Sequence, residues 1–196
     1  GLNMNINAGA IDNRKGSVLH AGYGALDITS GPLKLTDGQI ASNGNLNLSV
    51  SNIDGEKGIL LSKNDMHVIA GEVFLSGGQM SSGKSLHINA LSINSDNGQI
   101  TSNEKLALHT HGALVNSNGL IASNSDVNLQ TGSISNLDGI IVADNGLKGY
   151  LVPLLIGKNS PVIFECHGSK YVNERPFTFP FLSRLWFLIG VSVKKW

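Results

Sequence analysis

The residues best suited to chemistry in this sequence are two histidines, His67 and His87, which lie twenty positions apart between apolar neighbours. If the chain places them on adjacent strands, their side chains lie about 5 Å apart, and imidazole nitrogens at that distance can share a transition-metal ion. Other positions of this column hold Asn47, Ala107 and Asn128 rather than a third ligand. The sequence therefore favours a solvated polar ladder here, and we expect no metal site and no cofactor.

A second group of polar residues could support hydrolysis. In lyases and glycosidases, paired carboxylates do general acid and base work, and four acidic residues lie in the middle of the chain: Asp54, Glu56, Glu72 and Asp96. They fall at different positions of the repeat described below, or in turns, so they do not converge. His109 and His111 lie near an insertion and are interpreted as exposed loop residues, and the adjacent Cys166 and His167 have no third partner. The sequence thus predicts that the chain is not an enzyme.

An internal repeat of about twenty residues supplies the elements that position these side chains. Seven glycines mark it, with steps of 22, 20, 20, 20, 21 and 20 residues, at Gly16, Gly38, Gly58, Gly78, Gly98, Gly119 and Gly139. In the period from Gly98, for example, an aliphatic Ile100 and a small Ser102 are followed by the pair Leu106 and Leu108 and by a third apolar position at Leu114. Self-similarity at this period is typical of a solenoid.

The alternation of apolar and polar residues within each period has the period of two that a half-buried strand requires. Each period therefore holds three short strands, and the Asn, Gly, Asp and Ser residues between them supply positive φ or side-chain-capped turns. Stacking the periods about 4.8 Å apart buries a continuous aliphatic column. The sequence predicts an all-β fold, a right-handed parallel β-helix of about seven coils, because the strict hexapeptide period usual in left-handed versions is missing.

Composition and charge restrict the possible partners. The chain has 196 residues, a formal net charge of zero and 41% hydrophobic residues, which is enough to fill a narrow core. The repeat region up to Tyr150 has 8 Lys and Arg against 12 Asp and Glu. A nucleic-acid surface needs a basic stripe, so we expect no nucleic-acid partner.

The repeated pattern Gly-Gln-Ile-(Ala/Thr)-Ser-Asn-x-x-Leu-x-Leu, found at residues 38–48 and 98–108, resembles the filamentous haemagglutinin repeat of large bacterial two-partner-secretion exoproteins. The resemblance covers residues 2 to 147, roughly. It implies a right-handed β-helical shaft on the bacterial cell surface, exported through an outer-membrane transporter. The amino-terminal secretion domain of that family, with its Asn-Pro motifs, does not occur in this sequence, and neither does the Val-Glu-Asn-Asn boundary that precedes growth-inhibition toxins.

The resemblance implies two alternative functions. In the first, the chain is a shaft segment of a secreted, surface-displayed adhesin that attaches to a receptor or glycan on a host or neighbouring cell. In the second, it is the β-helical stick of a contact-dependent growth-inhibition effector that delivers a toxin. The flanking DNA would separate them, because an immunity gene downstream favours only the effector.

Two domains are expected, with a boundary near residue 150. Residues 1–149 carry the repeats, and residues 150–196 form a tail with four of the five prolines, five of the six phenylalanines and both tryptophans. The tail has three interpretations: a shifted reading frame, a terminal cap or module, or a membrane-associated segment at 177–193. The chain begins in mid-coil without a secretion signal, which indicates a piece of a longer protein.

Overall fold

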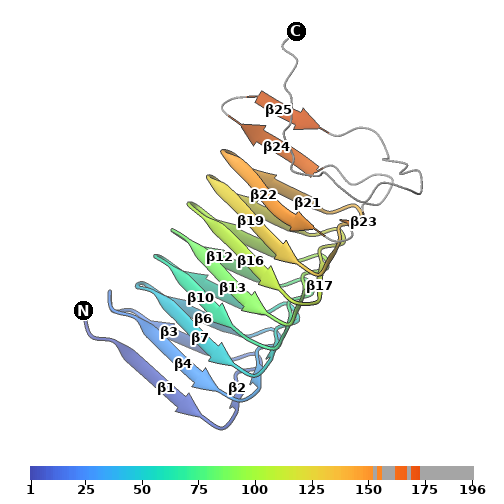
Figure 1. Cartoon of the computed structure of the whole chain (residues 1–196). Helices are drawn as coiled ribbons and strands as arrows, with labels where there is room; N and C mark the ends of the chain where they lie inside the picture. Colours follow the sequence, from blue (N-terminus) through green and yellow to red (C-terminus); the bar gives the residue numbers. More distant parts are fainter. Residues whose placement is uncertain (152–153, 156–161, 167–168, 173–196) are drawn as a thin grey trace.

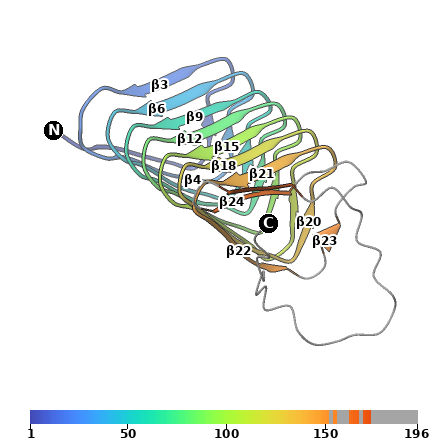
Figure 2. The same ribbon diagram turned by 90° about the horizontal axis from the view of Figure 1, so that it is seen from above.

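A computed structural model of the chain describes residues 1–151, 154–155, 162–166 and 169–172, and side chains for residues 1–148. All regular structure in these residues is β-strand, and the strands form three sheets that run along one axis (Figure 1). Seen from above, successive coils follow nearly the same outline (Figure 2). No helix long and apolar enough to cross a membrane is found in the described part of the chain.

Each coil contributes one strand to each sheet. Sheet A contains β1 (Met4–Ala8), β4 (Leu26–Ser30), β7 (Leu46–Val50), β10 (Met66–Ile69), β13 (Leu86–Ala90), β16 (Leu106–Thr110), β19 (Asp126–Thr131) and β22 (Gly146–Leu151). Sheet B contains β2 (Ile11–Asp12), β5 (Leu33–Lys34), β8 (Ile53–Asp54), β11 (Glu72–Phe74), β14 (Ser92–Asn94), β17 (Ala113–Val115), β20 (Ser133–Ser135) and β23 (Leu154–Leu155). Sheet C contains β3 (Ser17–His20), β6 (Gln39–Ser42), β9 (Ile59–Ser62), β12 (Gln79–Ser82), β15 (Gln99–Ser102), β18 (Leu120–Ser123), β21 (Ile140–Ala143), β24 (Val162–Cys166) and β25 (Ser169–Val172).

The strands of each sheet are parallel, except that β25 pairs antiparallel with β24. The register is the one that the repeat predicts: Ile100 pairs with Met80 in the preceding coil and with Ile121 in the following coil. These three side chains are completely buried. The prediction of an all-β parallel β-helix with about twenty residues per coil is therefore confirmed.

One hydrophobic core runs through the stack, because each strand turns alternate side chains inward. It contains the columns that the repeat predicts, including the pair Leu106 and Leu108 and the third apolar position Leu114. Beside it runs the predicted column of small residues, in which Ser62 donates a hydrogen bond to the carbonyl oxygen of Gly44 in the preceding coil at 2.9 Å. The serine hydroxyls thus bond one coil to the next at the corner between sheets C and A.

A further inward column lies at the corner between sheets B and C, and the sequence did not reveal it. No single residue type is common to its members, which are Asn13, Leu35, Gly55, Leu75, Ser95, Asn116 and Asn136. Ser95, Asn116 and Asn136 have no exposed surface. The Asn116 side-chain amide donates a 2.7 Å hydrogen bond to Oδ1 of Asn136, and its own Oδ1 accepts one from the Ser95 hydroxyl at 3.1 Å. The core is therefore polar at this corner in the later coils.

The repeated glycine is required by close packing of the coils rather than by a positive φ. The positive φ of each turn lies on the residue before it, at Lys15, Asp37, Lys57, Gly77, Asn97, Asn118 and Asp138. At Gly98, a Cβ atom would lie 2.6 Å from the carbonyl oxygen of Leu75 in the preceding coil, and at Gly58 it would lie 2.7 Å from that of Leu35. Glycine is required there because the coils approach closely, whereas the positive φ lies on the preceding residue, which is Asn, Asp or Gly at five of the seven turns, the residue types that the sequence predicts for positive φ.

Replacing Lys57 with glycine is expected to raise the free energy of unfolding by about 0.5–1 kcal/mol. Lys57 has φ of 51°, and a left-handed conformation strains any residue with a Cβ by about 1–2 kcal/mol, part of which the greater entropy of an unfolded glycine offsets. Gly77 occupies the same turn position one coil later, so Gly77→Ala is the matched control and should lower stability. Urea denaturation followed by circular dichroism measures both, and a change in the same direction for both variants would contradict the argument.

The end of the described chain crosses the expected domain boundary. β22 runs from Gly146 to Leu151 and pairs with β19 along its whole length, so Leu151 lies opposite Thr131. β23 and β24 then add one parallel strand each to sheets B and C. The division into 1–149 and 150–196 stays a prediction. The candidate membrane segment at 177–193 lies outside the described residues, so the three interpretations of the tail stay open.

Candidate functional site

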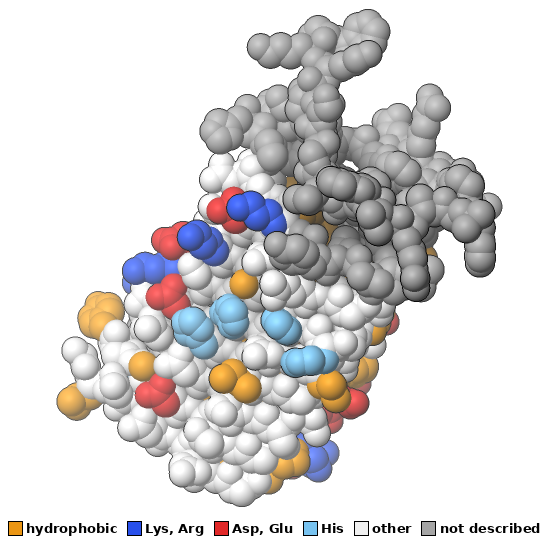
Figure 3. All heavy atoms as spheres, viewed as in Figure 1, with side chains coloured by type: hydrophobic (Ala, Val, Ile, Leu, Met, Phe, Trp, Pro, Cys, Tyr) orange, Lys and Arg blue, Asp and Glu red, His pale blue; other side chains and the backbone are white. Residues whose placement is uncertain are grey.

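Four histidines gather on the outer face of sheet A and are here called the histidine patch: His67, His87, His109 and His111. They come from β10, β13, β16 and the turn that follows β16. Figure 3 shows histidine side chains grouped on one face of the stack, beside a border of charged side chains. The patch holds four of the six histidines of the chain.

The strand alternation places the first pair of the patch. Met66 and Val68 on either side of His67 are completely buried, so the histidine between them must point outward. The same holds for His87, and the register of β10 and β13 puts the two directly opposite each other. Their ring centroids lie 6.1 Å apart and the rings are tilted by 39°. The predicted proximity of these two side chains is confirmed.

The second pair differs from its interpretation as exposed loop residues. His109 lies within β16, half-buried between the buried Leu108 and Thr110, and pairs with Asn89 and Gln130 of the neighbouring coils. That interpretation was wrong for His109, because the strand continues to Thr110. His111 is exposed in the next turn, and its ring centroid lies 5.3 Å from that of His109.

His87 connects the two pairs. Partial burial is the largest cause that lowers the pKa of His87 below its ordinary 6.5, and the nearby charges of His67 and His109 lower it further. The neutral imidazole is therefore favoured in the folded chain. Because the folded-state pKa lies below the unfolded one, protonation of His87 reduces stability as the pH falls below about 6.5.

The four acidic residues considered above lie on different strands or in turns, with Glu56 and Asp96 in turns. Asp54 ends β8 and Glu72 begins β11, and the Asp96 carboxylate accepts a hydrogen bond from the backbone N–H of Ser117 at 3.0 Å. Asp12 pairs with Arg14 at 2.7 Å, and this hydrogen bond lowers the pKa of the exposed Asp12 to about 2. Among the described residues, no three His, Cys, Asp or Glu side chains are placed to hold one metal ion together.

Cys166 and His167 cannot be placed in a site. Residue 167 lies outside the described residues, and the side chain of Cys166 is not described. Their interpretation as an incidental pair therefore stays a prediction.

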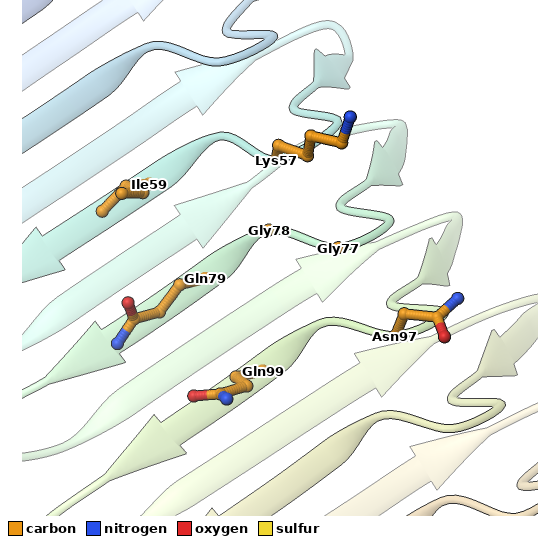
Figure 4. A pocket seen from close by; sticks show the side chains of 7 residues that line it. All are labelled: Lys57, Ile59, Gly77, Gly78, Gln79, Asn97 and Gln99. Carbon is orange, nitrogen blue, oxygen red and sulfur yellow. The ribbon is translucent and has the colours of Figure 1, made fainter.

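The outer face of sheet C has two shallow hollows. One, of about 200 Å³, crosses three coils, with Gln79 and Gln99 side by side and Lys57 and Asn97 at the turns (Figure 4). The other, of about 590 Å³, lies at the corner with sheet A. Both are open, and amides, hydroxyls, aliphatic side chains and the lysines Lys57 and Lys63 line them. In the larger hollow, Nδ1 of His20 lies 3.3 Å from the hydroxyl oxygen of Ser42. This face can therefore form hydrogen bonds with a polar partner.

Comparison with protein families gives one match. A family model described as the haemagglutinin repeat matches the chain in overlapping segments, at residues 3–50, 21–65, 41–117 and 91–148. Comparison with curated proteins and with solved structures gave no match. The matched segments together cover the coils that carry the histidine patch and both hollows.

Proposed function

The chain belongs to the haemagglutinin repeat family, and on that premise we propose that residues 3–148 are a structural shaft segment of a secreted, surface-displayed bacterial adhesin that attaches the cell to other cells. The observation that carries the proposal is the unbroken stack of coils with polar residues along its outer faces. Family membership supports the structural role and the surface location. Attachment is the proposed activity.

The fold supplies the stiffness that a shaft needs. Backbone hydrogen bonds run along the axis at every strand and continue through the turns, as from Gln99 N–H to the Gly78 carbonyl at 2.9 Å. The aliphatic core continues from coil to coil without a break. Because each coil contacts only its neighbours, further coils can be added to such a stack without changing its cross-section.

The outer faces supply the contacts. Ladders of Asn, Gln, Ser and Thr present amides and hydroxyls at the spacing of the coils, which suits a receptor or glycan with many polar groups. Export through an outer-membrane two-partner-secretion transporter is part of the proposal, because the family implies it.

A bead assay tests attachment. Beads coated with the full chain are expected to bind to cultured host cells or to neighbouring bacteria several-fold more than beads coated with albumin, and the soluble chain should compete. Beads coated with the Ile100→Asp variant, whose central coils should open, are the matched control and should lose most of the attachment. Equal attachment by chain-coated and albumin-coated beads would contradict the proposed adhesion.

The proposed location is tested separately on the producing bacterium. An antibody raised against the chain is expected to label intact cells, and protease added outside the cells should remove the label. Labelling that appears only after permeabilisation would contradict surface display.

A further inference from the structure

We propose that the histidine patch is a surface site for divalent transition-metal ions such as Ni²⁺, Cu²⁺ or Zn²⁺, in which each of two histidine pairs holds one ion. The first pair is His67 and His87, and the second is His109 and His111. This inference is independent of the proposed adhesion.

The distances within each pair suit a shared ion. With metal–nitrogen bonds of about 2.0–2.1 Å and a tetrahedral angle, the two ring centres lie about 5 Å apart. The observed separations are 5.3 Å for His109 and His111 and 6.1 Å for His67 and His87. The second pair already has the required spacing, and the first needs a rotation of exposed side chains rather than a movement of the backbone.

The backbone holds the first pair in position. His67 and His87 are directly opposite on paired strands, and their neighbours on both sides are buried in the core. Two ligands fixed in this way bind one ion more tightly than two independent imidazoles, because the second bond forms within the complex. From the sequence, the absence of a third ligand in the column of His67 and His87 argued against a metal site. The structure places a second histidine pair, His109 and His111, beside the first.

The chemistry of the patch favours transition metals over calcium or magnesium. Imidazole nitrogen suits nickel, copper and zinc, whereas calcium and magnesium prefer oxygen ligands. The lowered pKa of His87 keeps its imidazole neutral, and a neutral imidazole is the form that binds metal. Two protein nitrogens per ion leave the other coordination positions to water or to a group of another molecule, so the ion is exchangeable.

Titration of the full, untagged chain with nickel chloride, followed by isothermal calorimetry at about pH 7.5, tests the site. We expect two ions per chain, one for each histidine pair. The variant His67→Asn/His87→Asn and the variant His109→Asn/His111→Asn are each expected to lose one ion, and the variant with all four changes should bind at least about tenfold more weakly. Asparagine is a matched replacement, because Asn47 and Asn128 occupy the same outward column.

Three controls make the result specific. Circular dichroism should show the same β spectrum for every variant, since the changed residues lie outside the core. The variant Cys166→Ser/His167→Asn should bind nickel like the parent, and calcium chloride should not displace the nickel. Unchanged nickel binding by the variant with four changes, or loss of binding in the Cys166 and His167 variant, would overturn the proposal, as would a parent chain that binds no nickel.

The pH dependence gives a second readout. Binding should weaken as the pH is lowered to about 5.5, because the histidines take up protons. The titratable groups that face His87 are His67 from β10 and His109 from β16, and its direct neighbour on β16 is the uncharged Ala107. Binding that is independent of pH over this range would show that carboxylates hold the metal and would overturn the proposal.

Discussion

Replacement of Ile100 by aspartate is expected to lower the free energy of unfolding by several kcal/mol, enough to open the coils on either side. Ile100 has no exposed surface and lies between Met80 and Ile121 in the core column. A carboxylate at this position is buried without a partner. Since a coil of a solenoid contacts only its neighbours, the damage should remain local. Limited proteolysis should therefore cut the variant near residues 80–120, while distant coils persist.

The control for this prediction is His87→Asp. It places the same carboxylate on the outer face of sheet A, where the side chain is exposed, and should leave the proteolysis pattern and the circular-dichroism spectrum unchanged. If the two variants tolerated protease equally, the inward direction of Ile100 would be contradicted. Cleavage spread evenly over the coils would instead contradict the local nature of the damage.

Replacement of Asn116 by leucine is expected to lower the free energy of unfolding by about 1–3 kcal/mol, because it leaves buried polar groups without partners. The Asn116 amide donates to Asn136 Oδ1 at 2.7 Å and to the Ile140 carbonyl at 3.2 Å. After the change, Asn136 Oδ1 remains buried without this donor. Leucine has the same number of side-chain heavy atoms as asparagine but a larger volume, so overpacking adds to the effect of the lost hydrogen bonds. The shift of the urea midpoint measures it.

A double-mutant cycle separates the hydrogen bond from other effects. Asn136→Leu alone should also destabilise the stack, since Asn136 donates to the Gly139 carbonyl at 2.9 Å. The variant with both changes removes both amides, so its loss should be smaller than the sum of the two single losses by about 1 kcal/mol. Asn128→Leu on the exposed face is the control and should be nearly silent. Strict additivity of the two single losses would contradict a coupled pair.

Together these predictions divide the molecule into an interior that carries the stability and an exterior that is free to vary. The aliphatic columns and the asparagine pair lie inside and hold successive coils together through packing and hydrogen bonds. The histidine patch and the polar ladders lie outside and contribute little to stability. Because the outer side chains contribute little to stability, they can form new contacts, such as those of the proposed metal site, without changing the packing of the core.

The sequence by itself determined the β-helix, the register of the coils and the inward columns at Ile100, Ser102, Leu106 and Leu108. It could do so because contacts in a solenoid join residues one period apart, so the period in the sequence is also the spacing in the structure. The proximity of His67 and His87 followed from the same rule. Family membership agreed with this interpretation because the repeat itself carries it.

Only the tertiary structure decided what happens at the corners and across columns. The buried position of Asn116 and Asn136 was hidden because the same column holds Leu35 and Leu75 in earlier coils, and no shared residue type marks it. The role of the repeated glycine depends on how closely the carbonyl of one coil approaches the next, which is a property of backbone packing. The meeting of His109 with His111 depends on where β16 ends, and the proximity of His109 to His87 depends on a diagonal across two strands. Periodicity fixes neighbours along a column, but contacts between columns depend on the path of the backbone through each turn.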